Sequence, residues 1–414
     1  MPDAPTILKP ENPDQVLEAL KWASGEGVSV NVQGCGSKQA LGRVGEGEHT
    51  LDLSALDGII EYSPGELVLT AKAATPMAVI ENAVAEQGQQ LNFEPPDFGP
   101  LLGVGAGQGS IGGMIACNLA GARRIKTGAA RDHFLGFHGV SGRGEVFKSG
   151  GKVVKNVTGF DLSKLIAGSY GTLAVMTEAT LKVLPAPEKT RTVLVRWATD
   201  GVYDHAGMHS MTDALGSSHE VSAAAYIPAK LTSRSNVDYI RSVERSITAV
   251  RVEGPGPSVE HRANELKSML GKYGEIEELH SKNSMTFWKE VSDVSYFAED
   301  QDRVIWRLSV PPDAGSKVAM AILEDQSAEV FYDWGGGLIW LSAERRNNAG
   351  QAIIRATVEK VGGHATLFRA PDAFRQRLPV FHPQPEALAG ITKRVKEGFD
   401  PNGILNPGRM YEGV

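Results

Sequence analysis

Three glycine-rich segments of this 414-residue chain hold the residues best suited to binding an anion. Gln33–Ser37 follows a strand-like stretch, so its amides and a hydroxyl can form a nest for a negatively charged group. Ser110–Gly113 precedes a short helical stretch, whose first amides can point at a phosphate. Gly168–Leu173 turns into another strand. Each segment alone is better explained as a structural turn, but the three together predict a phosphate-containing ligand.

The middle segment also contains a dinucleotide fingerprint. Gly107, Gly109 and Gly112 have the G-x-G-x-x-G spacing, and Asp132 follows twenty residues after the last glycine. In a Rossmann site this motif follows a hydrophobic strand and opens a helix. Residues 95–106 are rich in proline and glycine instead, so a Rossmann nicotinamide site is disfavoured.

Residues 98–122 contain no charged side chain, a length that also raises the possibility of a membrane helix. The segment nevertheless contains eight glycines, together with Pro100, Gln108 and Asn118. Glycine removes side-chain packing and favours turns. We therefore interpret the segment as a binding loop rather than a membrane span.

Alternating helix and strand signals position these segments in the first half of the chain. Asn12-Pro13 begins a helix that Gly25 and Gly27 end, and Thr75-Pro76 begins another. Strands are expected at 28–32, 49–53, 66–71, 137–140, 145–148 and 173–184. Beyond residue 186, strands at 192–197, 304–310, 329–334 and 338–342 alternate with helices at 258–272, 313–325 and 349–361. This second pattern predicts an α+β domain with an antiparallel sheet.

Composition narrows the class of protein. The chain has 49 acidic and 42 Lys/Arg residues, a formal net charge of −7, which argues against a nucleic-acid binder. Two cysteines, Cys35 and Cys117, cannot by themselves hold an iron–sulfur cluster or a four-cysteine zinc site. They also exclude a disulfide framework, and the first fifteen residues lack the apolar core of a secretory signal. We therefore expect a cytoplasmic protein.

The order of the three glycine segments resembles the FAD-binding domain of the vanillyl-alcohol oxidase superfamily, also called the p-cresol methylhydroxylase (PCMH) type. The run Lys155–Leu162, continued by Ile166–Leu173, resembles the 2-hydroxy-acid dehydrogenase branch of that superfamily. Gly362–Arg369 narrows the resemblance to the smaller FAD-binding (E) subunits of bacterial glycolate oxidases, and the likeness extends over nearly the whole chain. Phe399–Arg409 is similar to the segment with which that branch returns to its flavin domain.

The resemblance implies an α+β fold with a two-subdomain PCMH-type FAD-binding domain over residues 1–186. It also implies a cap or substrate domain over 187–395 and a C-terminal segment, 396–414, that returns to the flavin domain. The residues implied to contact FAD are Gly34, Cys35, Gly36, Ser37, Lys38, Ser110, Gly112, Gly113, Asn118, Gly128, Gly171, Thr172, Val175 and Asn406. Among these, Gly34 to Lys38 would wrap the pyrophosphate and Asn406 would lie near the isoalloxazine ring.

This chain departs from the family pattern at two places in its first loop. Cys35 replaces a common glycine, so a positive φ is harder to reach there. Many relatives attach their flavin through a histidine in this loop, but Ser37-Lys38 offers none. We therefore expect FAD to be bound non-covalently.

The second half must supply any substrate chemistry. The His-rich motif and Gly-Asp-Gly-Asn run of metal-dependent relatives are missing from the sequence, so no metal is expected. Oxidising a 2-hydroxy acid requires an acceptor for the hydroxyl proton and a cation for the carboxylate. His364 and Arg369 are the candidates for these roles, although His364 also fits a turn after Gly362-Gly363. Arg307 lies in an apolar strand, where it can bind substrate or pair with an internal carboxylate.

The resemblance predicts an FAD-dependent subunit that oxidises glycolate, or a similar small 2-hydroxy acid such as D-lactate, to the 2-oxo acid. Its electrons would pass to a larger flavoprotein subunit and an iron–sulfur subunit of a complex, and through that complex the cytoplasmic chain would be peripheral to the inner membrane. One alternative is a flavin-holding structural or electron-transfer subunit without a substrate site. Another is a reductase of an enolpyruvyl nucleotide-sugar that uses a nicotinamide donor.

Overall fold

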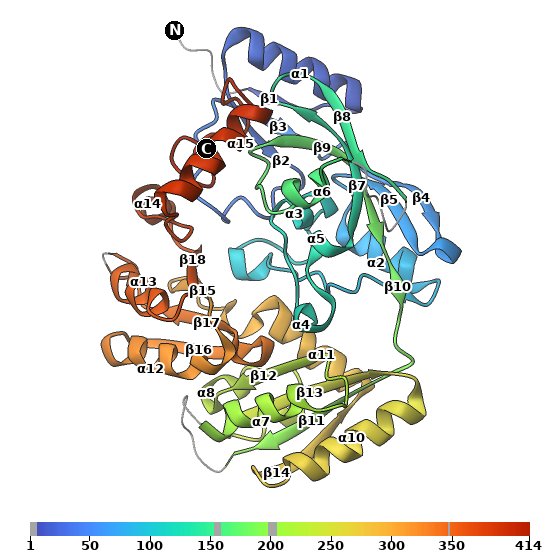
Figure 1. Ribbon diagram of the computed structural model, residues 1–414, viewed down its shortest axis with the longest axis vertical. Helices are drawn as coiled ribbons and strands as arrows, with labels where there is room; N and C mark the ends of the chain where they lie inside the picture. Colours follow the sequence, from blue (N-terminus) through green and yellow to red (C-terminus); the bar gives the residue numbers. More distant parts are fainter. Residues whose placement is uncertain (1–5, 153–158, 198–204, 347) are drawn as a thin grey trace. The chain divides into compact units, whose positions relative to one another are not determined.

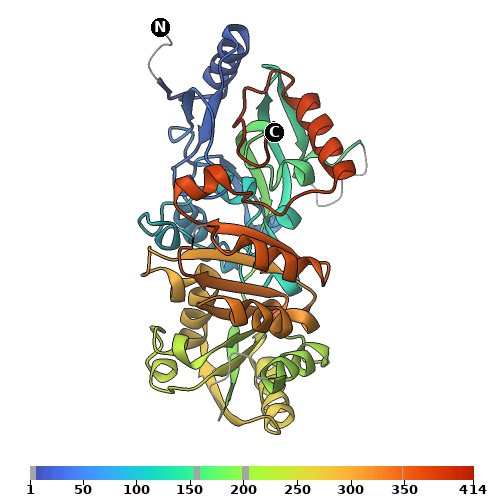
Figure 2. The ribbon, with the colours of Figure 1, turned by 90° about the vertical axis from the view of Figure 1, so that its left-hand side faces the viewer.

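The computed structural model describes residues 6–152, 159–197, 205–346 and 348–414, and the chain forms two compact units (Figures 1 and 2). The first unit comprises Met1–Ala120, Gly128–Pro185 and Arg375–Val414. The second comprises Gly121–Thr127 and Ala186–Phe374. Residues 155–158 of the motif Lys155–Leu162 lie outside the described residues.

The unit boundaries differ from the expected domains in two places. The chain returns to the first unit at Arg375, before residue 396, because the Arg375 guanidinium donates to the carbonyls of Gln39 (3.2 Å) and Gly42 (2.9 Å). Gly121–Thr127 belongs to the second unit, although it interrupts the first. Its Arg123 forms a buried ion pair with Glu253, an interaction that no local sequence pattern predicts.

The described part of the first unit contains a five-stranded antiparallel sheet in the order β4-β5-β9-β7-β8, a parallel β1-β3-β2 sheet and a β10-β6 pair. The strands are β1 (Ile7–Leu8), β2 (Val30–Gln33), β3 (His49–Asp52), β4 (Ile59–Ser63), β5 (Val68–Lys72), β6 (Gln89–Gln90), β7 (Phe134–Ser141), β8 (Val146–Gly150), β9 (Ala174–Lys182) and β10 (Leu184–Pro185). The helices are α1 (Pro13–Glu26), η1 (Pro64–Glu66), α2 (Met77–Ala85), η2 (Pro100–Leu102), α3 (Ile111–Ala116), α5 (Ala130–His133), α6 (Leu162–Ile166) and α15 (Glu386–Phe399).

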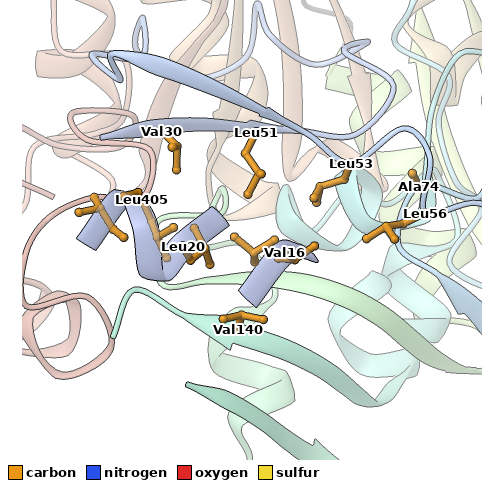
Figure 3. Close-up of a cluster of buried hydrophobic side chains, with 12 residues drawn as sticks. Val16, Leu20, Val30, Leu51, Leu53, Leu56, Ala74, Val140 and Leu405 are labelled. Atoms are coloured by element: carbon orange, nitrogen blue, oxygen red, sulfur yellow. The ribbon is translucent and has the colours of Figure 1, made fainter. Parts of the chain in front are cut away.

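Helix α1 begins as its sequence predicts. The side chain of Asn12 accepts a hydrogen bond from the Gln15 amide (3.0 Å), and Gly27 ends the helix in the left-handed region. Val16, Leu20 and Ala23 recur at helical spacing and are fully buried. Figure 3 shows α1 side chains between Val30 and Leu51 of the parallel sheet and Val140 of β7. This cluster joins the parallel sheet and the five-stranded sheet of the first unit into one core.

The C-terminal segment is held in the first unit by a buried ion pair. Lys396 at the end of α15 donates to Asp400 Oδ2 (2.7 Å) and to the carbonyls of Thr172 and Leu405 (2.8 Å each). The Asp400 carboxylate also accepts from the amides of Ile404 (3.0 Å) and Leu405 (2.8 Å). Burial lowers the pKa of Lys396, which Asp400 partly offsets. The network fixes the segment that follows, including Asn406.

The second unit contains an eight-stranded antiparallel sheet in the order β14-β11-β13-β12-β16-β17-β15-β18, which confirms the predicted α+β architecture (Figure 2). The strands are β11 (Lys189–Arg196), β12 (Ala223–Ile227), β13 (Ile247–Gly254), β14 (Glu275–His280), β15 (Val304–Ser309), β16 (Ala328–Asp333), β17 (Leu338–Ala343) and β18 (His364–Arg369). The helices are α4 (Arg124–Thr127), α7 (His205–Gly216), α8 (Ala229–Thr232), α9 (Asp238–Arg241), α10 (Gly256–Leu270), α11 (Ser281–Asp293), η3 (Ser295–Phe297), η4 (Pro312–Ala314), α12 (Gly315–Asp325), η5 (Trp334–Gly336) and α13 (Gln351–Glu359); α14 (Asp372–Arg377) spans the boundary at residue 375.

Residues 98–122 are not a continuous helix. They form η2, a series of turns and the six-residue helix α3. Throughout the described part of the chain, the helices are too short or too polar to cross a membrane.

Candidate functional site

The loop after β2 presents a row of backbone donors. Within the described structure, the amides of Gly34, Cys35, Gly36, Ser37 and Lys38 make no hydrogen bond to the protein. In β2, just before the loop, the amides have hydrogen-bond acceptors: Val30 donates to the carbonyl of Ile404 (2.8 Å) and Val32 donates to Asn406 Oδ1 (2.7 Å). The loop lines an open cavity in the first unit. Consecutive unpaired amides of this kind form an anion-binding nest.

A lysine adds positive charge to the same cavity. The Lys38 ammonium lies 3.3 Å from Ser37 Oγ, and it makes no other hydrogen bond or ion pair to a described residue. Burial lowers the pKa of Lys38. A half-buried ammonium with a hydroxyl as its protein partner is suited to an external anion. The loop therefore fits the pyrophosphate of a dinucleotide.

Cys35 is accommodated without strain. It does not occupy the positive-φ region, and Gly36 takes that conformation instead (φ 75°). The Cys35 thiol points to the carbonyl of Ala74 (3.5 Å), and burial raises its pKa. The substitution of cysteine for the family's glycine therefore leaves the nest intact.

Helix α3 lies beside this loop, but it uses its first amides internally. Ile111 donates to the carbonyl of Thr75 (3.0 Å), Gly112 to that of Ala73 (2.7 Å) and Gly113 to Ser110 Oγ (3.4 Å). The expectation that these amides point at a phosphate is therefore wrong, because the loop that precedes α2 supplies acceptors for the first two amides and the Ser110 hydroxyl accepts from the third. Ser110 and Gly113 still line the cavity.

The two glycines of this region serve close packing. A Cβ at Gly34 would lie 2.8 Å from Ser110 Oγ, and a Cβ at Gly112 would lie 2.7 Å from the Ala73 carbonyl. Real Cβ contacts are longer than this. The β2 loop, α3 and the segment after β5 can therefore approach one another this closely only without these side-chain atoms.

A second, more apolar cavity adjoins the first. The side chains of Leu53, Ile166, Ala174 and Met176 line it, together with Gly112 and Gly171. Both cavities share Val32, Gly34, Ser110, Tyr170 and Asn406. A polar nest continuous with an apolar space suits a ligand that has both a phosphate and a flat organic part.

Asn406 joins the loops around these cavities. Its Oδ1 accepts from the Val32 amide (2.7 Å) and its Nδ2 donates to the Tyr170 carbonyl (2.8 Å). Asn406 and Tyr170 both have a positive φ (45° and 54°), and Gly171 follows at 73°. Asn406 therefore holds β2 and the Gly168–Gly171 turn together while it lines both cavities.

Four residues that were expected to contact the cofactor line neither cavity: Asn118, Gly128, Thr172 and Val175. Asn118 accepts a hydrogen bond from the Arg131 amide (3.0 Å), and Gly128 is in a left-handed turn packed on Asp132. Thr172 donates to the Ser169 carbonyl (2.8 Å), and Val175 belongs to the buried hydrophobic cluster around α1. In the described structure these four residues stabilise the surrounding turns and core, and their contact with the cofactor stays a prediction.

In the second unit, one sheet face brings several polar side chains together. Arg307 of β15 pairs with Thr366 of β18, and Ser309 pairs with His364. Paired residues of antiparallel strands share a face, so Arg307 and His364 are diagonal neighbours, about 7–8 Å apart along the sheet by ordinary strand geometry. All four side chains are at least partly exposed. The Arg307 guanidinium lies 5.1 Å from the ring centre of Trp334, which Arg124 also contacts at 5.0 Å.

The same strand separates His364 from Arg369, the two residues that we expected to act together. They occupy opposite ends of β18, about 16 Å apart along the strand, and a register shift between Ile305 and Trp306 separates Arg369 from the regular pairs that include Arg307 and His364. The Arg369 guanidinium donates to the carbonyls of Phe297 (3.1 Å) and Arg303 (3.1 Å), among others, and burial lowers its pKa to about 10. This geometry fits a structural guanidinium that holds the turn after η3. We therefore pair His364 with Arg307 instead.

Among the described residues, no three His, Cys, Asp or Glu side chains are grouped so as to hold a metal ion. The absence of a metal from the working protein stays a prediction. Sequence reasoning missed Arg409 and Tyr170, which line the polar cavity. A lone arginine near the C-terminus carries no local signal of its contact with a loop near residue 38.

Comparisons with known proteins agree with this geometry. A family model described as an FAD binding domain matches residues 4–150. The chain is 33% identical to glycolate oxidase subunit GlcE of Escherichia coli (strain K12), over 96% of each chain. It is 26% identical to glycolate oxidase subunit GlcD of Bacillus subtilis (strain 168), over 99% of this chain and 89% of that one. The solved structure of 4-ethylphenol oxidase from Gulosibacter chungangensis has the same fold, with a TM-score of 0.72 at 12% identity over 100% of this chain and 91% of that one.

The nest, the cavity and the family model together define an FAD-dependent oxidoreductase with a PCMH-type FAD-binding fold. The chain belongs to the family of glycolate oxidase subunit GlcE. The predictions of fold class, cofactor and family are confirmed.

Proposed function

We propose that this chain is the FAD-binding subunit of a complex that oxidises glycolate, or a similar small 2-hydroxy acid, to the 2-oxo acid. The observation that carries the proposal is the similarity to a glycolate oxidase subunit over 96% of both chains, because it includes the second unit as well as the flavin domain. Similarity confined to the flavin domain would support only the cofactor.

The first unit would hold FAD non-covalently. The amides of Gly34 to Lys38 and the Lys38 ammonium would bind the pyrophosphate, and Ser110 and Asn406 would shape the cavity. Bound FAD would accept the hydride equivalent that leaves the substrate carbon. Ser37 and Lys38 stand where a covalent attachment would need a histidine.

The second unit would supply the substrate groups. Arg307, fixed over Trp334, would bind the carboxylate of the acid through charge-assisted hydrogen bonds. His364, on the same sheet face, would accept the hydroxyl proton. The strand register supports this assignment, because it makes Arg307 and His364 diagonal neighbours on one face. The carboxylate and the hydroxyl of a 2-hydroxy acid are on adjacent carbons, so two neighbouring side chains can contact both groups.

The electrons would then pass to partner subunits. The relatives are named as subunits, which implies an assembly of several chains. Two cysteines, both free, leave this chain without ligands for its own iron–sulfur relay. We propose a larger flavoprotein subunit and an iron–sulfur subunit as the partners, in the cytoplasm or peripheral to the inner membrane through the complex.

The test is to record the visible absorbance of the purified chain with bound FAD, without oxygen, while glycolate is added. Bleaching of the flavin band is expected, and acetate, which lacks the hydroxyl, should leave the band unchanged. His364→Gln should slow the bleaching with normal FAD content, whereas His261→Gln, an exposed histidine on α10, should not.

A flavin band that persists with the isolated chain but bleaches in the assembled complex, with or without His364, would contradict a substrate site here. It would support the alternative, a flavin-holding subunit without its own substrate chemistry. Reduction by NADPH but not by glycolate would favour the nicotinamide-dependent reductase.

A further inference from the structure

Two guanidinium groups from the C-terminal part of the chain donate hydrogen bonds to the loop that carries the nest. Arg409 Nη2 donates to the carbonyls of Lys38 and Gln39 (3.0 Å each), and its Nη1 donates to that of Arg43 (3.2 Å). Arg375 Nη1 donates to the carbonyls of Gln39 (3.2 Å) and Gly42 (2.9 Å). All of these residues belong to the first unit.

In residues 34–43, the amides and the carbonyls therefore have different partners. The amides of Gly34 to Lys38 are left for a ligand, whereas four carbonyls of the second part of the loop, those of Lys38, Gln39, Gly42 and Arg43, accept from positively charged donors. Carbonyl oxygens facing the cavity would repel an anion. By binding those oxygens, the arginines keep the negative ends of the peptide dipoles away from the nest.

Arg409 differs from Arg375 in one respect: it also lines the polar cavity. Its charge therefore acts on the cavity directly, in addition to Lys38. The positive charge at the polar cavity comes from Lys38 near the N-terminus and Arg409 near the C-terminus, so the sequence of the loop alone does not predict the second charge.

We propose that Arg409 is a positioning residue for the FAD pyrophosphate. It holds the carbonyls of Lys38 and Gln39, which orients the nest amides, and it supplies a second cation to a ligand that carries two negative charges. The proposal depends on FAD as the cofactor and is independent of which acid is oxidised.

Arg43 provides a matched control. It also joins the β2 loop to the C-terminal segment, since its Nε donates to the Gly408 carbonyl (3.0 Å), and it pairs with Glu46 (3.8 Å). Arg43 does not line the cavity and binds no carbonyl of the loop. If the arginines served only to attach the C-terminal segment, replacing Arg43 and replacing Arg409 would have similar effects.

The experiment measures the affinity of the full-length chain, stripped of flavin, for FAD by the quenching of flavin fluorescence at low and high salt. Arg409→Gln should weaken FAD binding roughly 10- to 100-fold, as expected for the loss of charged hydrogen bonds, and should reduce the salt dependence of the affinity. Arg409→Lys, which keeps the charge, should recover part of the affinity at low salt. Arg43→Gln should stay within about twofold of the unchanged chain.

The melting temperature of each flavin-free variant separates positioning from general stability. The proposal expects it to change little in Arg409→Gln. Two results would overturn the proposal: equal FAD affinities for Arg409→Gln and Arg43→Gln, or a loss of affinity that is independent of salt and accompanied by a large fall in melting temperature. Because no hydroxy acid is present, neither result bears on the proposed substrate.

Discussion

The two units offer their candidate ligands different kinds of groups. In the first unit, the donors are mainly backbone amides of one loop, and most nearby side chains shape the loop rather than bind. In the second unit, the candidate groups are side chains spaced along an antiparallel sheet, so strand register decides which of them meet. A site made of backbone amides depends on the hydrogen bonds that hold the carbonyls of its loop, here those from Arg375 and Arg409. A sheet site depends on local pairing, and the two should therefore respond differently to mutation.

The largest effect is expected where the first unit depends on a distant contact. Asp400→Ala removes the carboxylate that accepts from Lys396 and from two amides, and it leaves a buried ammonium without its countercharge. Breaking such a pair costs about 3–5 kcal/mol. Urea unfolding followed by circular dichroism should show this loss, together with release of FAD.

The control is an exposed ion pair. Asp238 pairs with Arg241, but its side chain is 87% exposed, so Asp238→Ala should change the free energy of unfolding by less than about 1 kcal/mol. If Asp400→Ala were equally mild and retained FAD, the dependence of the flavin site on the C-terminal segment would be refuted.

A pH effect is expected in the second unit. Burial alone would raise the pKa of Glu253, but Arg251 and Arg123 outweigh burial and lower it from 4.5 to about 2. The stabilisation is therefore complete above about pH 4.5 and is lost as the pH falls towards 2, at up to about 1.4 kcal/mol per pH unit, because the unfolded chain binds the extra proton.

Tryptophan fluorescence can follow this effect, since five of the six tryptophans lie in the second unit. Urea unfolding at about pH 5, 4 and 3 should show falling stability, and Glu253→Gln should flatten that dependence while lowering stability at neutral pH. An unchanged slope in the variant would assign the acid sensitivity to other carboxylates.

The substrate groups of the second unit should be separable from flavin binding. Arg307→Met keeps an unbranched apolar stem against Trp334 but removes the charge. We expect kcat/KM for glycolate to fall roughly 10- to 100-fold, mostly through KM, with unchanged affinity for FAD. Steady-state kinetics and flavin content measure the two quantities.

Arg345→Met is the matched control, because Arg345 is an exposed arginine of the same unit whose partner Asp302 lies on the surface. A loss of flavin in Arg307→Met, or equal kinetics in the two variants, would contradict the assignment of Arg307 to the substrate.

Local chemistry explains what the sequence could predict. The two glycines and the one hydroxyl of residues 33–38 indicate a nest, because the conformational freedom of a glycine depends on that residue alone. Helix α1 was predictable from Asn12, Pro13 and its apolar spacing. The first half of the chain could therefore be interpreted from short stretches.

The parts that could not be predicted depend on long-range partners. The Lys396–Thr172 and Arg409–Lys38 hydrogen bonds join residues more than two hundred positions apart, and the sequence around each donor does not indicate which carbonyl accepts from it.

Two elements were misjudged for local reasons. Strand β12 was missed because its five residues are all buried, so it lacks the alternation that marks a half-exposed strand. The α3 amides were assigned to a phosphate because a helix N-terminus usually has unpaired donors, whereas here Ala73 and Thr75 supply acceptors.

The smallest expected effect tests whether glycine in the first unit serves packing or the ligand itself. In Gly112→Ala, the new Cβ would meet the Ala73 carbonyl at 2.7 Å, so α3 must shift and the unit should lose about 1–3 kcal/mol of unfolding free energy. Gly25→Ala is the counterpart, because Gly25 lies exposed in α1 with no atom within 4 Å of its Cβ position. Alanine there should stabilise the chain by about 0.5–1 kcal/mol. Urea unfolding of both variants with FAD removed isolates the packing effect; if Gly112→Ala lost FAD affinity with no loss of stability, Gly112 would instead contact the cofactor.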